Sequence, residues 1–466
     1  MKKKQKDQLK ENAEKRKSNI VMSESSLDKI ISLCKRRGFI FQSSEIYGGF
    51  GAVYDYGPLG VELKNNISQL WWKCMTQNHQ NIIGLDSGIL MHPKIWEASG
   101  HVDAFNDPLV DCKQCKARYR ADELVDEDFL NTKWNEIQCP KCGTTGNLTN
   151  PRQFNLMFKT NIGPIESDSD IAYLRPETAQ GIYVNYLLVQ GAMRQKIPFG
   201  IAQIGKAFRN EIIARNFIFR TREFEQMEMQ YFVQPGTDDD AMVEWKNKRY
   251  NFYIDELGIN KDRLRFQDHG KDELAHYAKE AWDIEYEFPF GWSEVEGIHN
   301  RTDYDLKRHQ EFSGKNMQYS DQVLNEKYFP YIIETSAGLN RMLLTILCDA
   351  YWDDSDNNRI VMKLHPKLAP VKAVVCPLVK KDGLPEIGHK IVDELMKSFK
   401  VLYDQQGSIG KRYYRQDEAG TPFCITVDHE SKENNTVTLR NRDDQNQDRV
   451  SINDLVKIIQ NRMDIS

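Results

Sequence analysis

Two Cys-x-x-Cys pairs in one short polar segment constrain the fold of this chain more than any other feature. Cys112 and Cys115 form the first pair, and Cys139 and Cys142 form the second. Each pair can present two thiolates to one tetrahedral ion at about 2.3 Å. We therefore expect a zinc-binding insertion over residues 110–150, with a closed, structural coordination shell. A redox-active pair is the alternative, but no βαβ pattern surrounds the cysteines.

Composition is that of an ordinary globular protein. The chain has 466 residues, 40% of them hydrophobic and 28% charged, with a net charge of −5. This length suggests roughly three domains. No run of 18 apolar residues occurs, so we expect no membrane span. Residues 1–24 form a basic tail that we expect to be flexible and solvated, with weak contact to nucleic acid as the alternative. The tail lacks the apolar stretch of a signal peptide, so we expect a cytoplasmic protein.

Apolar periodicity divides the chain into two parts. It predicts helices at Leu27–Phe41, Val61–Cys74 and Leu339–Trp352, and strands at Ile201–Arg209, Phe224–Val233 and Tyr331–Glu334. The polar stretch at residues 235–290 is predicted to be a helical insertion, with a strand returning at Asp283–Glu287. After His365 and Pro366 strands and helices alternate, which predicts a separate α/β domain over residues 366–466.

A candidate nucleotide site lies around the two extended runs that flank a basic loop. Arg209, in Phe208-Arg-Asn-Glu211, can form a forked contact with a phosphate. Phe224, at the start of the next run, offers a flat face for a purine ring. By composition alone, a solvated hairpin is an equally good interpretation.

A third piece lies far along the chain, where a predicted strand ends in Glu334, turns through Gly338 and enters an apolar helix. Arg341 then stands at a helix start, where the dipole also favours a phosphate. The string Gly200–Lys206 has the spacing Gly-x-x-x-x-Gly-Lys, but Ala207 follows it where a P-loop carries Ser or Thr, so we expect no P-loop nucleotide site.

These segments resemble the three signature motifs of class II aminoacyl-tRNA synthetases. The helix from Val61 into a strand ending at Pro93 resembles the first motif, residues 208–228 the second and residues 338–341 the third. More specifically, the chain is similar to the homodimeric glycyl-tRNA synthetases over nearly its whole length. The strings that carry this similarity are Tyr54–Gly60, Arg175–Gly181, Asp272–Tyr277, Arg301–Leu306 and Arg415–Phe423. The resemblance implies an antiparallel-sheet catalytic domain over residues 25–365, an α/β (α+β) fold class and a C-terminal anticodon-binding domain.

The resemblance also implies roles at matching positions. The ATP-binding set would be Arg209, Asn210, Glu211, Phe219, Arg220, Thr221, Arg222, Glu223, Phe224, Glu294, Val295, Gly338 and Arg341. The glycine-binding set would be Glu177, Phe224, Glu225, Gln226, Met227, Glu228, Arg301, Glu334 and Ser336. Arg209, Arg341 and Glu334 would act in catalysis, and Glu294 and Glu334 would hold magnesium with ATP. Two positions depart from the family pattern: Thr335 replaces a usual proline, and Asn340 stands where an acidic residue is common.

The implied reaction activates glycine with ATP and transfers it to tRNA(Gly). Two carboxylates, Glu177 and Glu228, can pair with the glycine ammonium, and selectivity must come from excluding a β-carbon. A class II synthetase for another small amino acid and a non-catalytic nucleic-acid-binding relative are the alternatives. Such relatives tend to lose the ATP residues, which this chain keeps.

The resemblance further implies a homodimer and RNA binding by the last domain. The expected dimer helix carries an apolar stripe of Leu63, Ile67 and Leu70. The last domain combines basic and aromatic residues at Gly410–Arg415, which suit phosphate pairing and base stacking. Without the resemblance, a solvated strand edge is the simpler interpretation of that segment.

Overall fold

The computed structural model describes residues 26–465, apart from residues 126–129, 165–169, 213–215 and 271–277. The basic tail at 1–24 and the string Asp272–Tyr277 therefore lie outside the described residues. Within the described ranges, no helix is both long and apolar enough to cross a membrane.

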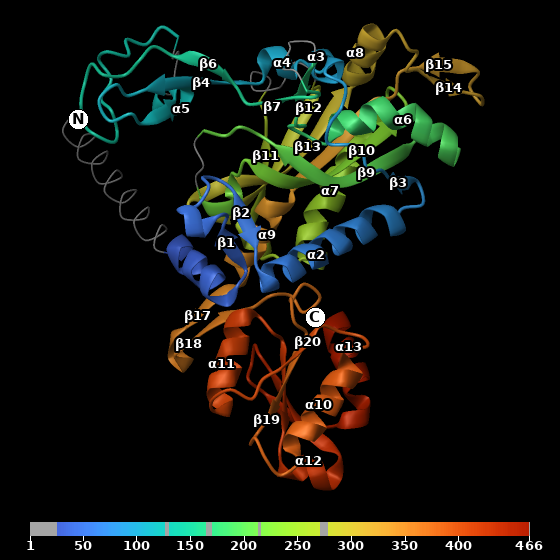
Figure 1. Cartoon of the computed structure of the whole chain (residues 1–466). Coiled ribbons are helices and arrows are strands. Elements are labelled where there is room, and N and C mark those ends of the chain that lie inside the picture. The colour runs from blue at the N-terminus through green and yellow to red at the C-terminus, as the bar shows by residue number, and fades with distance from the viewer. Residues whose placement is uncertain (1–25, 126–129, 165–169, 213–215, 271–277, 466) are drawn as a thin grey trace, which may run out of the picture.

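A seven-stranded sheet forms the centre of the larger part of the molecule (Figure 1). Its strands lie in the order β11-β12-β13-β16-β10-β9-β3. Their bounds are β3 Ile82–Gly84, β9 Phe199–Phe208, β10 Glu223–Val233, β11 Leu264–Asp268, β12 Glu280–Phe288, β13 Gly291–Thr302 and β16 Tyr331–Gly338. Only β3 runs parallel to its described neighbour. The antiparallel core expected from the sequence is confirmed.

Helices cover both faces of this sheet (Figure 1). They are α2 Pro58–Trp72, α6 Ala179–Met193, α7 Asp238–Asn251 and α9 Leu339–Ala350, and residues 26–37 are also helical. Met227 and Met229 of β10 lie in a core shared with α2, α7 and α9. On the other face, Phe232 stacks on Tyr186 of α6. Because strand side chains alternate, the even-numbered residues of β10 face the α6 side.

Short elements form the connections and one small lobe. The pairs are β1 Ile40–Gln42 with β2 Tyr54–Tyr56, β7 Lys159–Asn161 with β8 Ile171–Tyr173, β14 Tyr319–Asp321 with β15 Glu326–Tyr328, and β17 Tyr351–Asp354 with β18 Arg359–Met362. The short helices are α3 Lys94–Ala98, α4 His101–Ala104, α5 Ala121–Leu124 and α8 Tyr304–Ser313. The cysteine-bearing lobe contains a three-stranded sheet of β4 Asn106–Asp111, β5 Arg118–Arg120 and β6 Arg152–Asn155. It projects from the upper left of the sheet in Figure 1.

The apolar stripe of α2 packs inside the chain. Leu63 and Ile67 are fully buried in the core shared with α9, and Leu70 packs against the same core. These side chains are therefore not available for the subunit interface expected from the sequence. The strand that follows is β3, while the segment expected to end a strand at Pro93 contributes only an isolated bridge at Leu90.

Residues 235–290 are partly helical and partly strands of the sheet, which corrects the expected helical insertion in its second half. Helix α7 and the π-helical turn Phe252–Glu256 account for the helical pattern. Residues 264–268 and 280–288, however, are strands β11 and β12. Strand β11 lies at the sheet edge, and Leu264 and Phe266 alternate there with the exposed Arg265 and Gln267, but this run of five residues is too short to stand out beside the helical pattern before it.

The C-terminal part is a second α/β unit, drawn in orange and red below the sheet in Figure 1. Its strands lie in the order β20-β19-β21-β22-β23. The bounds are β19 Ala373–Pro377, β20 Val401–Tyr403, β21 Phe423–Val427, β22 Thr436–Asn441 and β23 Gln447–Ser451, with helices α10 Leu384–Leu395, α11 Ile409–Ala419, α12 His429–Asn434 and α13 Leu455–Ile465. It buries its own core around Val375, Ile391 and Ile425. The alternation after His365 thus corresponds to a distinct unit.

The basic and aromatic residues at 410–415 lie on helix α11, which replaces the strand edge considered from the sequence. Arg412 is buried and donates to the carbonyls of Pro377 and Gly407 at 2.6 and 2.9 Å. Arg415 donates to Asp404 at 2.6 Å. Both arginines therefore stabilise the unit itself, while Tyr414 remains exposed at the surface.

Candidate active site

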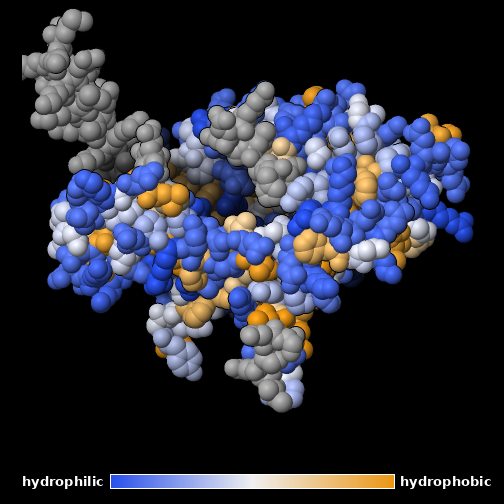
Figure 2. Space-filling model, turned by 90° about the horizontal axis from the view of Figure 1, so that it is seen from above, coloured by the Kyte–Doolittle hydropathy of each residue, from blue (hydrophilic) through white to orange (hydrophobic). Residues whose placement is uncertain are grey.

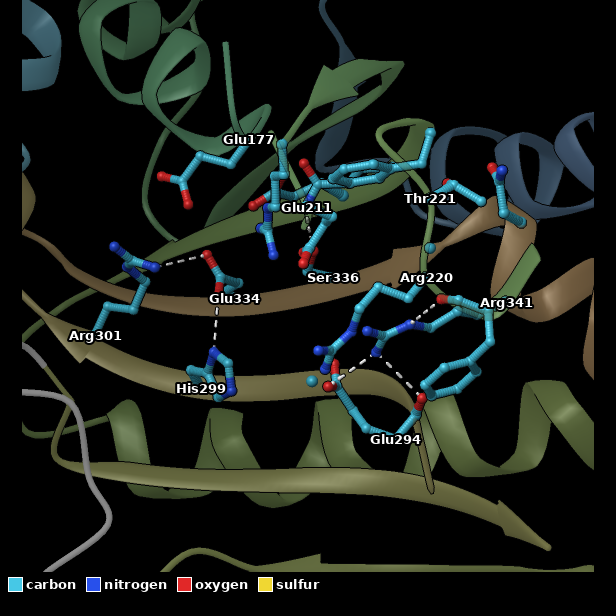
Figure 3. A pocket seen from close by; sticks show the side chains of 18 residues that line it. Glu177, Glu211, Arg220, Thr221, Glu294, His299, Arg301, Glu334, Ser336 and Arg341 are labelled. Carbon is cyan, nitrogen blue, oxygen red and sulfur yellow. Dashed lines mark hydrogen bonds and ion pairs between the residues drawn. The ribbon is translucent and has the colours of Figure 1, made fainter. Parts of the chain in front are cut away.

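A polar cleft opens on the α6 side of the seven-stranded sheet. It is lined by Glu177, Arg209, Glu211, Phe219, Arg220, Thr221, Phe224, Gln226, Glu228, Glu294, Gly297, His299, Arg301, Glu334, Ser336, Gly338, Asn340 and Arg341. Figure 3 shows these side chains converging from β10, β13, β16 and the loop before β10. From above, the molecular face is hollowed near its centre, and the walls of the hollow are hydrophilic (Figure 2).

The pairing of β10, β16 and β13 brings together the residues in the middle of the cleft. Glu228 of β10 pairs with Ser336 of β16, and two residues along these strands Gln230 pairs with Glu334. Glu334 in turn pairs with His299 of β13. These residues project to one face because cross-strand partners share a side of the sheet. Residues far apart in sequence thus form one polar surface.

A β-bulge in β13 brings Glu294 into the same cleft. The pairing with β12 shifts by one residue at this point. Val295 joins the core, and Glu296 is buried in an ion pair with Arg249 at 2.5 Å, so both point away from the cleft. Glu294 and Gly297 on either side of this step therefore both line the cleft.

Glu334 is the most heavily bonded carboxylate in the cleft. His299 Nδ1 lies 2.8 Å from its Oε1, while Arg301 Nη1, Gln230 Nε2 and Tyr183 OH lie 3.1, 2.8 and 3.4 Å from Oε2. Burial alone would raise the pKa of Glu334, but Arg301 and His299 hold it well below its ordinary value. The single hydroxyl hydrogen of Tyr183 donates at shorter range to Gln230 Oε1, at 2.9 Å, and among the described residues Oε1 of Glu334 bonds only to His299. Glu334 therefore keeps acceptor positions, and its expected role as a magnesium ligand stays a prediction.

Two further carboxylates stand at the same end. Burial opposes ionisation of Glu177, but His101, 3.4 Å away, lowers the pKa of Glu177 to about 2. Glu228 accepts a hydrogen bond from the Thr178 hydroxyl, yet burial, reinforced by Glu334 and Glu177, raises the pKa of Glu228 well above its ordinary value. This end of the cleft therefore lacks enough positive charge to ionise all of its carboxylates, and a cationic group fits there.

The opposite end of the cleft is cationic. Arg341, in the first turn of α9, places Nη1 2.9 Å from Glu294 Oε2 and lies 4.5 Å over the ring of Phe219. The charge of Arg341 lowers the pKa of Glu294. Figure 3 shows Arg341, Arg220 and Glu294 together on the right, and Glu177, Arg301 and Glu334 on the left.

An arginine and an aromatic ring connect the two ends. The guanidinium of Arg209 lies 5.3 Å from the ring centre of Phe224, and its Nε donates to the Pro176 carbonyl at 3.1 Å. Burial raises the pKa of Glu211, against the opposing charges of Arg220 and Arg209. A planar ligand with phosphates would find a ring face, a hydrogen-bonding carboxyl and guanidinium groups here.

Most of the sequence-predicted residues meet in this cleft. They are Arg209, Glu211, Phe219, Arg220, Thr221, Phe224, Glu294, Gly338 and Arg341 from the ATP set, and Glu177, Phe224, Gln226, Glu228, Arg301, Glu334 and Ser336 from the glycine set. Asn210, Arg222, Glu223, Glu225, Met227 and Val295 do not line it.

Side-chain alternation explains much of this separation. Met227 and Val295 face the core behind the sheet. Glu225 and Glu223 form ion pairs with lysines outside the cleft. Arg222 donates to the backbone carbonyls of Glu211 and Gly51, so it holds the loop in place instead of facing the cleft.

Sequence reasoning missed His299 and Gly297 and gave no ligand contact to Asn340. Counting back from Arg301 in steps of two along a strand would have placed His299 and Gly297 on the same face. The Oδ1 of Asn340 accepts from the backbone N–H of Glu225 at 3.2 Å, which ties α9 to β10 at the cleft. Thr335 keeps regular pairing on both sides of β16, so the missing proline does not interrupt the strand.

The four cysteines of the small lobe converge as their spacing predicts. Ligand atoms of Cys112, Cys115, Cys139 and Cys142 all lie within 4.8 Å of one another. Two Sγ–Sγ distances are 3.7 Å, close to the roughly 3.8 Å edge of a tetrahedron with 2.3 Å metal–sulfur bonds. The pKa of Cys139 is lowered to about 6, and the largest cause is a hydrogen bond from the Tyr119 hydroxyl. This donor set fits a structural metal ion.

Two family models match the chain. Residues 158–350 match the class II tRNA synthetase core domain of the glycine, histidine, proline, serine and threonine group. Residues 372–462 match an anticodon binding domain. The first match contains most of the cleft, and the second covers nearly all of the C-terminal α/β unit.

Several bacterial proteins are similar to this chain over almost its whole length. The glycine–tRNA ligase of Treponema denticola is 61% identical over 442 residues, which cover 93% of this chain and 96% of that protein. The glycine–tRNA ligase of Borrelia hermsii is 56% identical over 93% of this chain and 96% of its own length. That of Chlorobaculum tepidum is 50% identical over 94% of this chain and 100% of its own length. With the cleft, the two domain matches and these relatives in agreement, the chain belongs to the glycine–tRNA ligase family of class II aminoacyl-tRNA synthetases.

Proposed function

We propose that this chain activates glycine with ATP, forming glycyl-adenylate and pyrophosphate, and then transfers glycine to the 3′ end of tRNA(Gly). The observation that carries this proposal is the division of a single cleft into an arginine-rich end and an end with a surplus of buried carboxylates. The first suits a triphosphate, and the second suits a small ammonium compound.

ATP would occupy the end built by the loop before β10 and by the start of α9. Arg209 and Arg341 would contact the phosphates, and Arg220 would reach the outer ones. Phe224 would stack on the adenine ring, with Glu211 beside its amino group. The guanidinium of Arg209 lies 5.3 Å from the centre of the Phe224 ring, so an adenine ring stacked on Phe224 would have its phosphates within reach of Arg209.

Glycine would occupy the carboxylate-rich end. Its ammonium group would pair with Glu177 and Glu228, and its carboxylate would point toward the phosphates. Gly297 lines this region, and a β-carbon added there would lie 3.0 Å from the His299 ring, so space is already tight. Rejection of alanine would rest on a steric clash, which costs more than the roughly 1 kcal/mol of a lost methyl contact.

The chemical step requires no side-chain nucleophile. A glycine carboxylate oxygen attacks the α-phosphorus, and the bond from phosphorus to the pyrophosphate oxygen breaks. The arginines stabilise the charge that develops on the phosphates, and the cleft holds the two substrates in position. Glu294, whose carboxylate faces the cleft and is half exposed, and Glu334 would hold a magnesium ion bound with ATP. Such an ion would supply additional charge stabilisation.

Several further properties belong to the proposal. The C-terminal unit would bind the anticodon end of tRNA(Gly), and the four cysteines would hold zinc. The protein would act in the cytoplasm as a homodimer. Since the α2 stripe is buried, exposed apolar side chains such as Leu90, Leu188 and Met193 are better candidates for a subunit contact. Sedimentation should then give a particle of about twice the 54.3 kDa chain mass.

ATP–pyrophosphate exchange with individual amino acids tests the function directly. Glycine alone should support exchange, and purified tRNA(Gly) should then accept labelled glycine. Exchange with another small amino acid would point to a different class II specificity. Absence of exchange with every amino acid, in folded protein that still binds RNA, would favour a non-catalytic relative.

A further inference from the structure

Gln180 is a fully buried polar residue outside the cleft lining that contacts Glu177 of the cleft and Asp305, the partner of the cleft residue Arg301. It is the second residue of α6 and has no exposed surface. Gly181 allows the helix to approach the segment before α3 closely, because a β-carbon there would lie 2.1 Å from the Ser87 hydroxyl. The start of α6 is therefore fixed in position against the sheet, and Gln180 with it.

The carboxamide of Gln180 donates to two carboxylates. Its Nε2 lies 2.9 Å from Glu177 Oε1 and 3.2 Å from Asp305 Oδ1. Asp305 in turn receives Arg301 at 2.9 and 3.2 Å, and Arg301 reaches Glu334 at 3.1 Å. A single amide group therefore links the carboxylate expected to pair with the ammonium group to the arginine that neutralises Glu334.

His309 of α8 contacts the oxygen of this amide. Its Nε2 lies 2.9 Å from Gln180 Oε1. Burial lowers the pKa of His309, which favours the neutral ring, and with its one N–H on Nε2 this ring donates to the amide oxygen. With the amide reversed, its oxygen would face the carboxylates of Glu177 and Asp305, so only one orientation is satisfied.

We propose that Gln180 is a positioning residue for amino-acid recognition: it holds Glu177 and the Asp305–Arg301 pair at a fixed separation, and His309 keeps its amide oriented. This inference rests on the proposed function and concerns the ammonium-binding end of the same cleft. The choice of an amide has a chemical reason. A lysine or arginine at this position would neutralise Glu177, and an ionised glutamate would repel it. A neutral double donor orients the carboxylate and leaves its charge for the substrate.

Gln180→Leu tests the proposal in the full-length protein. Loss of the two hydrogen bonds to charged acceptors should raise the KM for glycine about 10-fold or more in the exchange reaction. The KM for ATP should change far less, because Gln180 makes no contact with the arginines at the other end. Gln190→Leu is the matched control, since Gln190 lies on the same helix, outside the cleft lining, and donates to the Gln195 carbonyl at 2.6 Å. It should leave both KM values unchanged.

A pair of substitutions at His309 provides a second test if Gln180→Leu does not fold. His309→Gln keeps an N–H donor that can reach the amide oxygen, and His309→Phe removes it. The proposal expects near-normal glycine KM for the first variant and a raised glycine KM for the second. Equal KM values in these two folded variants would contradict the assignment of His309 as the orienting donor.

The outcomes separate this inference from the proposed function. Wild-type protein without glycine-dependent exchange would remove the proposed function itself. Wild-type exchange together with a folded Gln180→Leu variant of normal glycine KM would overturn only the positioning role. Equal rises in the KM values for glycine and ATP, accompanied by a lower unfolding temperature, would show that Gln180 acts merely in packing. This result would also overturn the positioning role.

Discussion

Arg359 of β18 donates to Asp417 of α11 at 2.8 Å, and both side chains are almost completely buried. Asp417 also receives Arg440 at 2.8 and 3.0 Å, and Arg359 also bonds to Asp354 at 2.7 Å. Strand β18 belongs to the hairpin that follows α9, and α11 belongs to the C-terminal unit. A buried ion network therefore joins the two parts of the molecule, assisted at the surface by Arg37 and Glu418.

Asp417→Ala should weaken this junction severely. It leaves Arg359 and Arg440 without their shared carboxylate, and an uncompensated buried charge costs about 3–5 kcal/mol. Arg359→Leu should cost less, because Asp417 keeps Arg440. Chemical denaturation measures both effects, with Glu394→Ala in the exposed Glu394–Lys397 pair as the control. Equal, small losses for all three variants would show that the network contributes nothing to docking.

Arg209→Ala should abolish adenylate formation while the protein stays folded. Loss of one charge-assisted contact made in the transition state lowers the exchange rate on the order of 10²-fold or more. Arg265→Ala serves as the control, because Arg265 pairs with Glu285 on the edge of the same sheet, away from the cleft. Near-normal exchange by the folded Arg209 variant would remove Arg209 from the phosphate site.

Cys139→Ser should remove the metal of the small lobe. Elemental analysis of the wild-type protein, purified without chelators, should find about one zinc per chain, and the variant should lose most of it. Cys74→Ser is the matched control, since Cys74 lies outside the cluster. Wild-type protein without zinc, or undiminished zinc in the Cys139 variant, would contradict the assignment.

Lys372 gives a pH dependence with a definite sign. Its ammonium donates to the carbonyls of Pro366, Lys367 and Ala369 at 3.0, 2.7 and 2.8 Å, and burial lowers the pKa of Lys372 from 10.5 to about 8. Between these two pH values the unfolded chain binds more protons than the folded one, so the contribution of Lys372 to the free energy of unfolding rises with pH.

The test compares the wild-type protein with Lys372→Met across this window. The difference in unfolding free energy between the two should move in favour of the wild type as the pH rises from about 8 to 10.5. The exposed Lys397 provides the control substitution, Lys397→Met, for which the difference should stay flat. A flat difference for Lys372 as well would contradict the lowered pKa.

Local patterns predicted the elements that carry strong apolar periodicity. Strands β9, β10 and β16 and helix α9 lie within one to four residues of their expected ends. The family resemblance supplies consecutive residues and does not separate the two faces of a strand, so the expected glycine set holds Met227 of the core beside Gln226 and Glu228 of the cleft. Local patterns also could not reveal tertiary partners. The α2 stripe is buried against other parts of the same chain, and the edge strand β11 alternates over only five residues, which is too short to be recognised.

The site residues that lie in consecutive runs within a motif were predictable from the sequence. The residues that reach the cleft only through long-range strand pairing were not. His299 reaches Glu334 only because β13 pairs with β16. The bulge beside Val295 shifts which residues of β13 face the cleft, and no local signal marks it. Gln180 lies inside the string Arg175–Gly181. The string does not show that its amide reaches Glu177 in the loop before α6 and Asp305 in α8.

The two faces of β16 limit how this site can change over evolutionary time. Ile333, Thr335 and Ala337 point into the core, while Glu334 and Ser336 point into the cleft. A one-residue insertion or deletion within the strand would exchange these sets, placing a buried carboxylate in an apolar core and an isoleucine or threonine at the substrate. Variation in substrate preference must therefore arise by replacing side chains at fixed positions, and length changes are confined to the connecting loops.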